Sequence, residues 1–172
     1  MDGYKIDECL ESMTILVDTR EQPSERAQKR YNSFTRPFRR QKLNYGDYSA
    51  LFVLNGQEIQ IKAAVERKMN LEELSSCFTH GRGRFQREME RAIADKASIY
   101  LLVEDASWER LINGKYNTRF NSKAFFASIT TWTARYDLKP IFCKKEMSGK
   151  IINEILYREL KERLERGDYD EL

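Results

Sequence analysis

Two β-strands joined by a tight turn are predicted for residues 45–67. The segment from Tyr45 to Leu54 is largely apolar and aromatic, as a strand requires. Asn55-Gly56 follows, and this dipeptide is a strong hairpin-turn signal. From Gln57 to Arg67, polar side chains at 58, 60 and 62 alternate with isoleucines at 59 and 61. We therefore expect one continuous return strand that pairs with the first strand in an antiparallel hairpin.

Strand and helix patterns alternate on both sides of this hairpin. Short apolar runs predict strands at 14–19, 98–103 and 140–143, with edge structure at 36–42. Helices are predicted at 23–31, 71–78, 84–96, 108–112, 122–136 and 148–166. The alternation predicts a three-layer α/β fold in which helices flank a mixed central sheet. We expect a single domain over residues 1–172, with its core at about 14–145 and a C-terminal helix at about 148–166.

Composition argues against a membrane-spanning or disulfide-stabilised chain. Charged residues make up 33% of the 172 residues, and no apolar run approaches the roughly 20 residues that a membrane helix needs. Residues 1–11 are polar and acidic, without a signal-peptide pattern. The three cysteines are widely spaced, which favours reduced thiols. We therefore expect an intracellular protein that is not secreted and does not contact a membrane.

Basic residues are concentrated in one segment although the net charge is only +3. Residues 20–42 contain eight Lys and Arg residues against two Glu, whereas acids outnumber bases in the last twenty residues. A basic segment of this kind suits the phosphates of a nucleic acid. Taken alone, it is equally typical of a solvated surface.

Acidic residues and one lysine are expected to meet at one rim of the sheet. Asp18 ends the first predicted strand, Asp47 opens the hairpin, and Glu66 and Lys68 end its return strand. Because side chains alternate along a strand, Glu66 and Lys68 face the same side. Carboxylates hold Mg²⁺ through hard oxygen ligands, and a nearby lysine can stabilise charge on a phosphate. Each residue alone also has an ordinary explanation as a turn residue or a surface ion pair.

Four motifs, in this order, resemble a known family. They are Asp18-Thr19-Arg20-Glu21, Gly46-Asp47-Tyr48, Val65-Glu66-Arg67-Lys68 and Gly83-Arg84-Phe85. Together they are similar to the XPF-type nuclease domain of structure-specific DNA endonucleases, and the resemblance covers about residues 14–143. It implies a restriction-endonuclease-like fold and Mg²⁺- or Mn²⁺-dependent cleavage of DNA.

The resemblance implies site residues by motif match. Asp18, Asp47 and Glu66 are expected at the metal, with Lys68 as the catalytic lysine and Arg67 beside it, contacting phosphate or bracing the carboxylates. The arginines expected to contact DNA, from these motifs and the basic segments, are Arg20, Arg39, Arg40, Arg82, Arg84 and Arg87. Three acidic residues are left without an assigned role: Glu21, Glu72 and Glu73. Either glutamate of the last pair faces the metal, or both only occupy the first turn of a helix, where acids are favourable.

Partners follow from the same resemblance. XPF-type domains commonly pair through the nuclease domain, so we expect a homodimer, with the helix at 121–136 and the strand at 140–143 as candidate contacts. Many relatives also carry helix-hairpin-helix or helicase regions, which are not found here, so a separate helicase or DNA-binding partner stays open. The expected activity is cleavage of flap, fork or branched DNA in repair or recombination. It would take place in the cytoplasm of a bacterium or phage-infected cell, or in a nucleus.

Three alternatives remain at this point. Some members of the family lose the metal residues and serve as non-catalytic DNA-binding scaffolds, although Asp47, Glu66 and Lys68 are intact here. A sequence-specific restriction-type nuclease would share the same core. RNA is a further candidate substrate.

Overall fold

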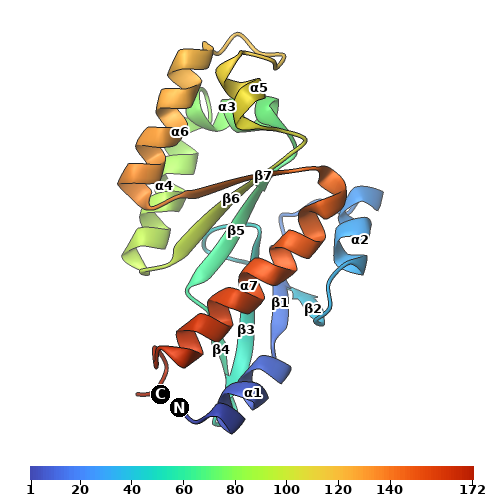
Figure 1. Cartoon of the computed structure of the whole chain (residues 1–172), viewed down its shortest axis with the longest axis vertical. Helices are drawn as coiled ribbons and strands as arrows, with labels where there is room; N and C mark the ends of the chain where they lie inside the picture. The colour runs from blue at the N-terminus through green and yellow to red at the C-terminus, as the bar shows by residue number, and fades with distance from the viewer.

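Seven strands form one mixed sheet, and helices cover both of its faces (Figure 1). The structure is a computed structural model and describes all residues, 1–172. The strands are β1 (Thr14–Val17), β2 (Phe38–Arg40), β3 (Tyr48–Leu54), β4 (Gln57–Gln60), β5 (Ala63–Lys68), β6 (Ser98–Glu104) and β7 (Lys139–Cys143). The helices are α1 (Gly3–Glu11), α2 (Glu25–Asn32), α3 (Leu71–Phe78), α4 (Arg82–Ala94), α5 (Trp108–Ile112), α6 (Ser122–Tyr136) and α7 (Ser148–Glu165), with a short 3₁₀ helix η1 (Lys145–Met147) before α7.

The order of strands across the sheet is β2-β1-β3-β5-β6-β7, and β4 pairs with β3 outside this path. Strand β3 runs antiparallel to β1, β4 and β5, whereas β1–β2, β5–β6 and β6–β7 are parallel pairs. The edge structure expected at 36–42 and the strand expected at 140–143 contain the two edge strands of this path, β2 and β7. The predicted three-layer α/β fold with a mixed sheet is confirmed.

Each face of the sheet has its own apolar core. Helices α1, α2 and α7 cover one face, where the sheet contributes residues such as Val65 and Leu102. Helices α3 to α6 cover the other face, to which Ala64, Leu101 and Val103 contribute. Neighbouring residues of β5 and of β6 thus enter opposite cores, as the two-residue period of a strand requires. Any side chain at the end of β5 is therefore directed to one defined side.

The predicted return strand is wrong in one respect, because it consists of two strands. After the turn, β4 pairs with β3, and the chain then bends at Ile61 and Lys62. Strand β5 leaves the hairpin, meets β3 only at the Tyr48–Val65 pair and runs parallel to β6 along its whole length. Buried Ile61 holds the bend, since its backbone N–H donates to the carbonyl oxygen of Ala50 at 2.9 Å. The bend places the end of β5 in the interior of the sheet.

The N-terminal residues form a helix that the sequence pattern did not predict. Asp2 caps α1 through its side chain, and α1 buries Cys9 and Leu10 against the sheet. The side chains of Asn70 and Asn121 likewise cap α3 and α6. None of the helices combines the length and the apolar character that crossing a membrane would require.

Candidate functional site

The end of β5 directs Glu66 and Lys68 to one face of the sheet and Arg67 to the other. Lys68 Nζ donates to Glu66 Oε1 at 2.5 Å and lies 5.5 Å from the centroid of the Phe85 ring in α4. The Arg67 guanidinium instead donates to Glu21 on the opposite side, at 3.0 Å. The structure therefore brings Glu66 and Lys68 together, as the alternation along the strand predicts.

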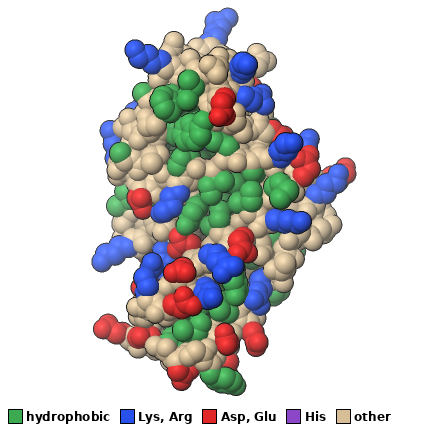
Figure 2. Space-filling view, viewed as in Figure 1, with side chains coloured by type: hydrophobic (Ala, Val, Ile, Leu, Met, Phe, Trp, Pro, Cys, Tyr) green, Lys and Arg blue, Asp and Glu red, His purple; other side chains and the backbone are tan.

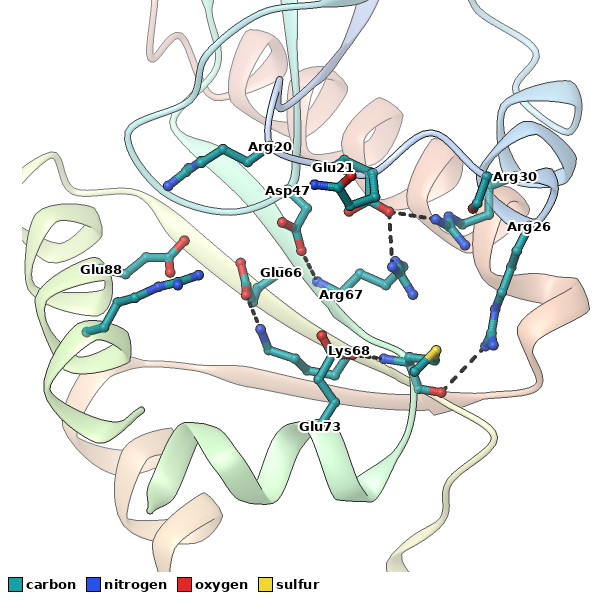
Figure 3. A pocket seen from close by; sticks show the side chains of 14 residues that line it. Arg20, Glu21, Arg26, Arg30, Asp47, Glu66, Arg67, Lys68, Glu73 and Glu88 are labelled. Carbon is teal, nitrogen blue, oxygen red and sulfur yellow. Dashed lines mark hydrogen bonds and ion pairs between the residues drawn. The ribbon is translucent and has the colours of Figure 1, made fainter. Parts of the chain in front are cut away.

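Asp47 is held over the end of β5 by backbone hydrogen bonds to two strands. Its N–H donates to the carbonyl oxygen of Val65 at 2.9 Å, and its carbonyl oxygen accepts from the N–H of Asp18 at 2.8 Å. Its carboxylate Oδ2 accepts from the backbone N–H of Arg67 at 2.8 Å. These bonds fix the position of the Asp47 carboxylate next to Glu66 (Figure 3).

Gly46 is required by the turn that carries Asp47. Its φ is +72°, and a Cβ there would lie 2.7 Å from the Cβ of Ala64. Gly46→Ala is expected to lower the free energy of unfolding by about 2–5 kcal/mol, since left-handed strain costs about 1–2 kcal/mol and overpacking about 1–3 kcal/mol. Gly56→Ala is the matched control, because its φ is +77° but nothing lies within 4 Å of the added Cβ. Denaturant titration of both variants measures the difference, and equal losses would contradict a packing role for Gly46.

A polar pocket of about 370 Å³ opens over Asp47, Glu66 and Lys68 (Figure 3). We call it the carboxylate pocket. Helix α4 closes one side of it with Glu88, whose Oε1 accepts from the N–H of Gly46 at 2.7 Å. Only one of its 14 lining residues is hydrophobic. Its lining suits a charged, hydrated ligand rather than an apolar one.

Burial and like charge raise the pKa values of two carboxylates in this pocket. Burial raises the pKa of Glu66 to about 7; the ammonium of Lys68 opposes the rise and the carboxylate of Glu88 adds to it. Burial and then Glu66 raise the pKa of Asp47 well above its ordinary value. Burial alone would lower the pKa of Lys68, but Glu66 raises it, so Lys68 stays a cation. Of these three carboxylates only Glu66 forms an ion pair, with Lys68.

The donor set fits a magnesium ion that retains several of its waters. Asp47 and Glu66 supply hard oxygen donors from different parts of the sheet, and Mg²⁺ is commonly bound by one or two carboxylates plus substrate phosphate. The structure contains no group of three or more acidic, His or Cys side chains arranged to hold a metal by themselves. Water and a substrate phosphate would therefore complete the coordination.

Asp18 does not line the carboxylate pocket, which differs from its predicted place at the metal. Its buried carboxylate accepts from Arg20 Nε at 2.7 Å, from the N–H of Arg20 at 2.8 Å and from the N–H of Leu43 at 2.6 Å. Burial would raise the pKa of Asp18, but these hydrogen bonds outweigh it and lower the pKa below its ordinary value. These donors already occupy the carboxylate, so Asp18 braces Arg20, which does line the pocket.

An arginine network forms one side of the pocket and consists of Glu21, Arg26, Arg30, Arg67 and Glu104. All but Glu104 line the pocket. Arg67 bridges the two glutamates, at 3.0 Å from Glu21 and 3.2 Å from Glu104. Arg30 donates to Glu21 at 2.6 Å, and Arg26 pairs with Glu104. Glu104 is fully buried and Glu21 is 8% exposed. The Arg67 side chain thus braces glutamates, and the carboxylate of Glu21 is already paired within this network.

The chain matches the model of a known protein family. The family model of the ERCC4 domain matches residues 17–155. The chain belongs to the ERCC4 domain family. The sequence-based recognition of an XPF-type nuclease domain is therefore confirmed.

Two solved structures are similar to this ERCC4 domain. XPF from Aeropyrum pernix has 19% sequence identity and a TM-score of 0.59, over 83% of this chain and 64% of that one. XPF from Aeropyrum pernix in complex with DNA has 20% identity and a TM-score of 0.58, over 84% and 63%. The chain thus spans less than two thirds of either XPF chain, and the likeness is one of fold. Among curated proteins, none matches the chain significantly.

The two glutamates of α3 lie in different places in this ERCC4 domain. Glu73 lines the carboxylate pocket, and its Oε2 accepts from the N–H of Met69 at 2.5 Å. Glu72 lies outside the pocket, where its Oε1 accepts from the N–H of Asn117 at 2.8 Å. Both lie in the first turn of α3. Only Glu73 is near the proposed metal ligands, and its carboxylate already accepts the N–H of Met69.

The predicted DNA-contacting arginines fall into different surroundings. Arg20 and Arg84 line the carboxylate pocket. Arg82 and Arg87 are exposed on α4, outside this pocket. Arg82 and Arg87 remain free to reach a phosphate backbone that passes beside the pocket.

Arg39 and Arg40 lie on β2 and do not line the pocket. Arg39 forms a two-pronged ion pair with Glu58, at 2.7 and 2.8 Å. Arg40 donates to the carbonyl oxygens of Thr19 and Glu21, both at 2.8 Å. Both side chains are thus engaged within the chain, which weakens their assignment to DNA.

Sequence reasoning did not assign two of the glutamates that shape this site. Glu88 lies four residues after Arg84, and this helical spacing places both on one face of α4. Glu104 ends β6, which runs parallel to β5, so the carboxyl ends of the two strands meet. Both positions could therefore be inferred only once it was known that α4 and β6 lie beside β5.

Proposed function

We propose that this ERCC4 domain is a metal-dependent DNA endonuclease that hydrolyses phosphodiester bonds. The observation that carries the proposal is the placement of Asp47, Glu66 and Lys68 in one open, polar pocket. Membership of a family of structure-specific DNA endonucleases and the likeness to XPF in complex with DNA support DNA as the substrate. Mg²⁺ is the proposed cofactor, and Mn²⁺ is expected to substitute for it.

The residues of the pocket have distinct proposed roles in the reaction. Asp47 and Glu66 would hold the cation, which when bound activates water and offsets charge on the scissile phosphate. The ammonium of Lys68, next to Glu66, stabilises negative charge that builds on the phosphoryl oxygens. A bond forms between the water oxygen and phosphorus while the bond to the 3′-oxygen breaks. The 3′-oxygen takes up a proton, and the products are a 5′-phosphate and a 3′-hydroxyl.

Flap, fork or branched DNA is the proposed substrate, in repair or recombination, and a cleavage panel tests this. Purified protein is incubated with labelled single-stranded, duplex, flap, fork and four-way DNA in Mg²⁺ or Mn²⁺. Cuts at junctions support a structure-specific endonuclease, whereas cuts at fixed sequences indicate a restriction-type enzyme. Binding without any cutting indicates a DNA-binding scaffold and overturns the proposal, as does cleavage confined to an RNA panel.

A homodimer through α5, α6 and β7 is the second part of the proposal. Strand β7 is an edge of the sheet, and hydrophobic side chains gather near it on the molecular surface (Figure 2). Phe126 of α6 is 38% exposed and Ile112 of α5 is 48% exposed. The ring of Phe126 also packs edge-to-face on Trp108, with ring centroids 5.9 Å apart. This face resembles an interface rather than a set of scattered apolar residues.

Phe126→Glu is expected to convert the dimer into a monomer, because a charge at an apolar interface loses its hydration on association. Light scattering at micromolar concentration should give twice 20.4 kDa for the unmodified chain and 20.4 kDa for the variant. Ile93→Glu is the matched control, since Ile93 is 47% exposed on α4, away from this face. A single 20.4 kDa particle for the unmodified chain would exclude the dimer.

A further inference from the structure

A second polar pocket adjoins the carboxylate pocket, between the start of α2 and the start of α7. We call it the flanking pocket; its volume is about 440 Å³. It shares Ser24, Arg26 and Arg30 with the carboxylate pocket, so the two are continuous (Figure 3 labels both arginines). None of its eight lining residues is hydrophobic. The flanking pocket is therefore an extension of the site, built from polar groups.

Cations outnumber carboxylates in the flanking pocket. Its charged lining residues are Arg26, Lys29, Arg30 and Lys145 against Glu25 and Glu146. Lys29 pairs with Glu25 at 2.9 Å on the exposed surface of α2, an interaction of small energy. The ammonium of Lys145 forms no ion pair. The lining of the flanking pocket thus has two more cations than carboxylates, against one more in the carboxylate pocket.

Arg30 carries a donor without a partner at this pocket. Its side chain is only 3% exposed, and it donates to Glu21 at 2.6 Å and to the hydroxyl of Tyr48 at 3.0 Å. Its Nη1 has no hydrogen-bond partner, and the nearest carboxylate oxygen, Glu104 Oε1, is 3.7 Å away. An unmet donor on a buried guanidinium is costly unless a ligand or a water supplies an acceptor. Glu104 Oε1 also lacks a partner, so either an acceptor on a ligand or a water between the two groups would satisfy Nη1.

Two helices begin beside the flanking pocket. The hydroxyl of Ser24 caps α2, while the N–H groups of Glu25 and Arg26 have no acceptor. Helix α7 begins without a side-chain cap, and Gly149 lets it approach α2 closely, because a Cβ there would lie 2.5 Å from the carbonyl oxygen of Arg30. The positive ends of two helix dipoles therefore meet near one polar cavity. This arrangement favours an anion.

We propose that the flanking pocket is a subsite for a backbone phosphate of the DNA strand, next to the phosphate that is cut. The inference rests on the proposed nuclease function and names the part of the substrate that this pocket holds. Arg26, Lys29 and Lys145 contact the flanking phosphate while its neighbour lies in the carboxylate pocket. A phosphate supplies both negative charge and several acceptor oxygens, which match the free donors and the positive charge described above. The subsite fixes the direction in which the strand leaves the site, toward α2.

The first test measures the salt dependence of DNA binding without metal. The variant Lys29→Ala/Lys145→Ala is compared with the matched control Lys96→Ala/Lys161→Ala, whose lysines lie outside both pockets. Loss of one phosphate contact should weaken binding of a labelled fork about tenfold in low salt. It should also reduce the slope of log K against log salt by about 0.9. The control should change neither value, and equal behaviour of the two double variants would overturn the subsite.

The second test locates the phosphate. Single methylphosphonates, which are neutral, replace one phosphate at a time along the bound strand. In the unmodified chain one position should weaken binding about tenfold, and in Lys29→Ala/Lys145→Ala the same replacement should have no further effect. The absence of any coupled position would overturn the proposal. Equal melting temperatures of the variants and the unmodified chain establish that folding is intact.

These binding tests separate the subsite from the nuclease activity. If the chain binds DNA and shows the coupled position but does not cut, the nuclease proposal fails and the subsite stands. If it cuts and no coupled position exists, the subsite fails and the nuclease proposal stands. If it binds no DNA in any salt, both are wrong.

Discussion

Asp47→Asn should reduce the rate of DNA cleavage by about 10³-fold while leaving DNA affinity without metal unchanged. The loss of one carboxylate ligand removes charge stabilisation worth several kcal/mol, and about 1.4 kcal/mol corresponds to each factor of ten in rate. The amide oxygen of asparagine can still accept the hydrogen bond that Arg67 N–H donates to Asp47, at 2.8 Å. The turn should therefore keep its position, so the variant removes the negative charge without changing the geometry of the site.

Stability without metal gives a second readout for the same variant. Burial and Glu66 raise the pKa of Asp47 in the folded chain, so its ionised carboxylate destabilises the folded state at neutral pH. A group of this kind contributes stability below its unfolded pKa and loses it as the pH rises toward the folded pKa. Asp47→Asn should therefore melt at a higher temperature than the unmodified chain at pH 7. A role of Asp47 as an ordinary turn residue predicts no such gain.

Titration with Mg²⁺ or Mn²⁺ completes the test of Asp47. An ion that binds only the folded state raises its stability by about 2.7 kcal/mol at a concentration of 100 times Kd. The unmodified chain should show this rise in melting temperature, and Asp47→Asn should lose most of it. Asp137→Asn is the control, because Asp137 is an exposed residue after α6 that pairs with Lys139. Full cleavage by Asp47→Asn, or an unchanged response to metal, would remove Asp47 from the proposed site.

The local patterns of the sequence were sufficient for the parts of the site that depend on one strand. Alternation along β5 correctly places Glu66 and Lys68 on one face and Arg67 on the other. The bend at Ile61 was not predicted, because period-two alternation continues through it and a break in pairing leaves no mark on such a pattern. The assignment of Glu66 and Lys68 survives this error because their relative orientation depends only on β5.

Long-range contacts explain where the predicted site differs from the observed one. Asp18 directly follows β1, close to its expected place, yet the N–H of Leu43, 25 positions away in the chain, and the side chain of Arg20 occupy its carboxylate. Glu88 reaches Gly46 across 42 positions, which no local period can indicate. Charge and spacing thus identify which residue types belong to a site. Hydrogen-bond donors from elements distant in the sequence determine which of these side chains face the pocket.

The arginine network also could not be predicted from local sequence patterns. It links the site to the stability of the fold. Its five members come from the segment after β1, α2, β5 and β6, so they are dispersed through the sequence. Arg67 connects this network to the carboxylate pocket, since its backbone N–H holds Asp47 and its side chain holds Glu21 and Glu104. A change in the network should therefore reach the pocket through the backbone of β5.

Glu104→Gln should lower the free energy of unfolding by about 3–5 kcal/mol, which is the cost of removing one partner from a buried ion pair. Glu104 is fully buried, and it faces Arg26, Arg30 and Arg67. In the variant Arg30 and Arg67 keep Glu21 as their buried carboxylate partner. Arg26 keeps only the exposed Asp105, at 3.8 Å. For a chain of this length the melting temperature should fall by roughly 6–20 °C, at about 2–4 °C for each kcal/mol.

Glu58→Gln is the matched control for this effect, because it makes the same chemical change in an exposed ion pair. Glu58 bonds Arg39 with both carboxylate oxygens, but the two side chains are 53% and 43% exposed, and such pairs contribute about 0–1 kcal/mol. Denaturant titration of both variants measures the contrast. A loss in Glu104→Gln as small as in Glu58→Gln would mean that Glu21 alone compensates the buried arginines. It would also mean that the position of Arg67, and of Asp47 through it, does not depend on Glu104.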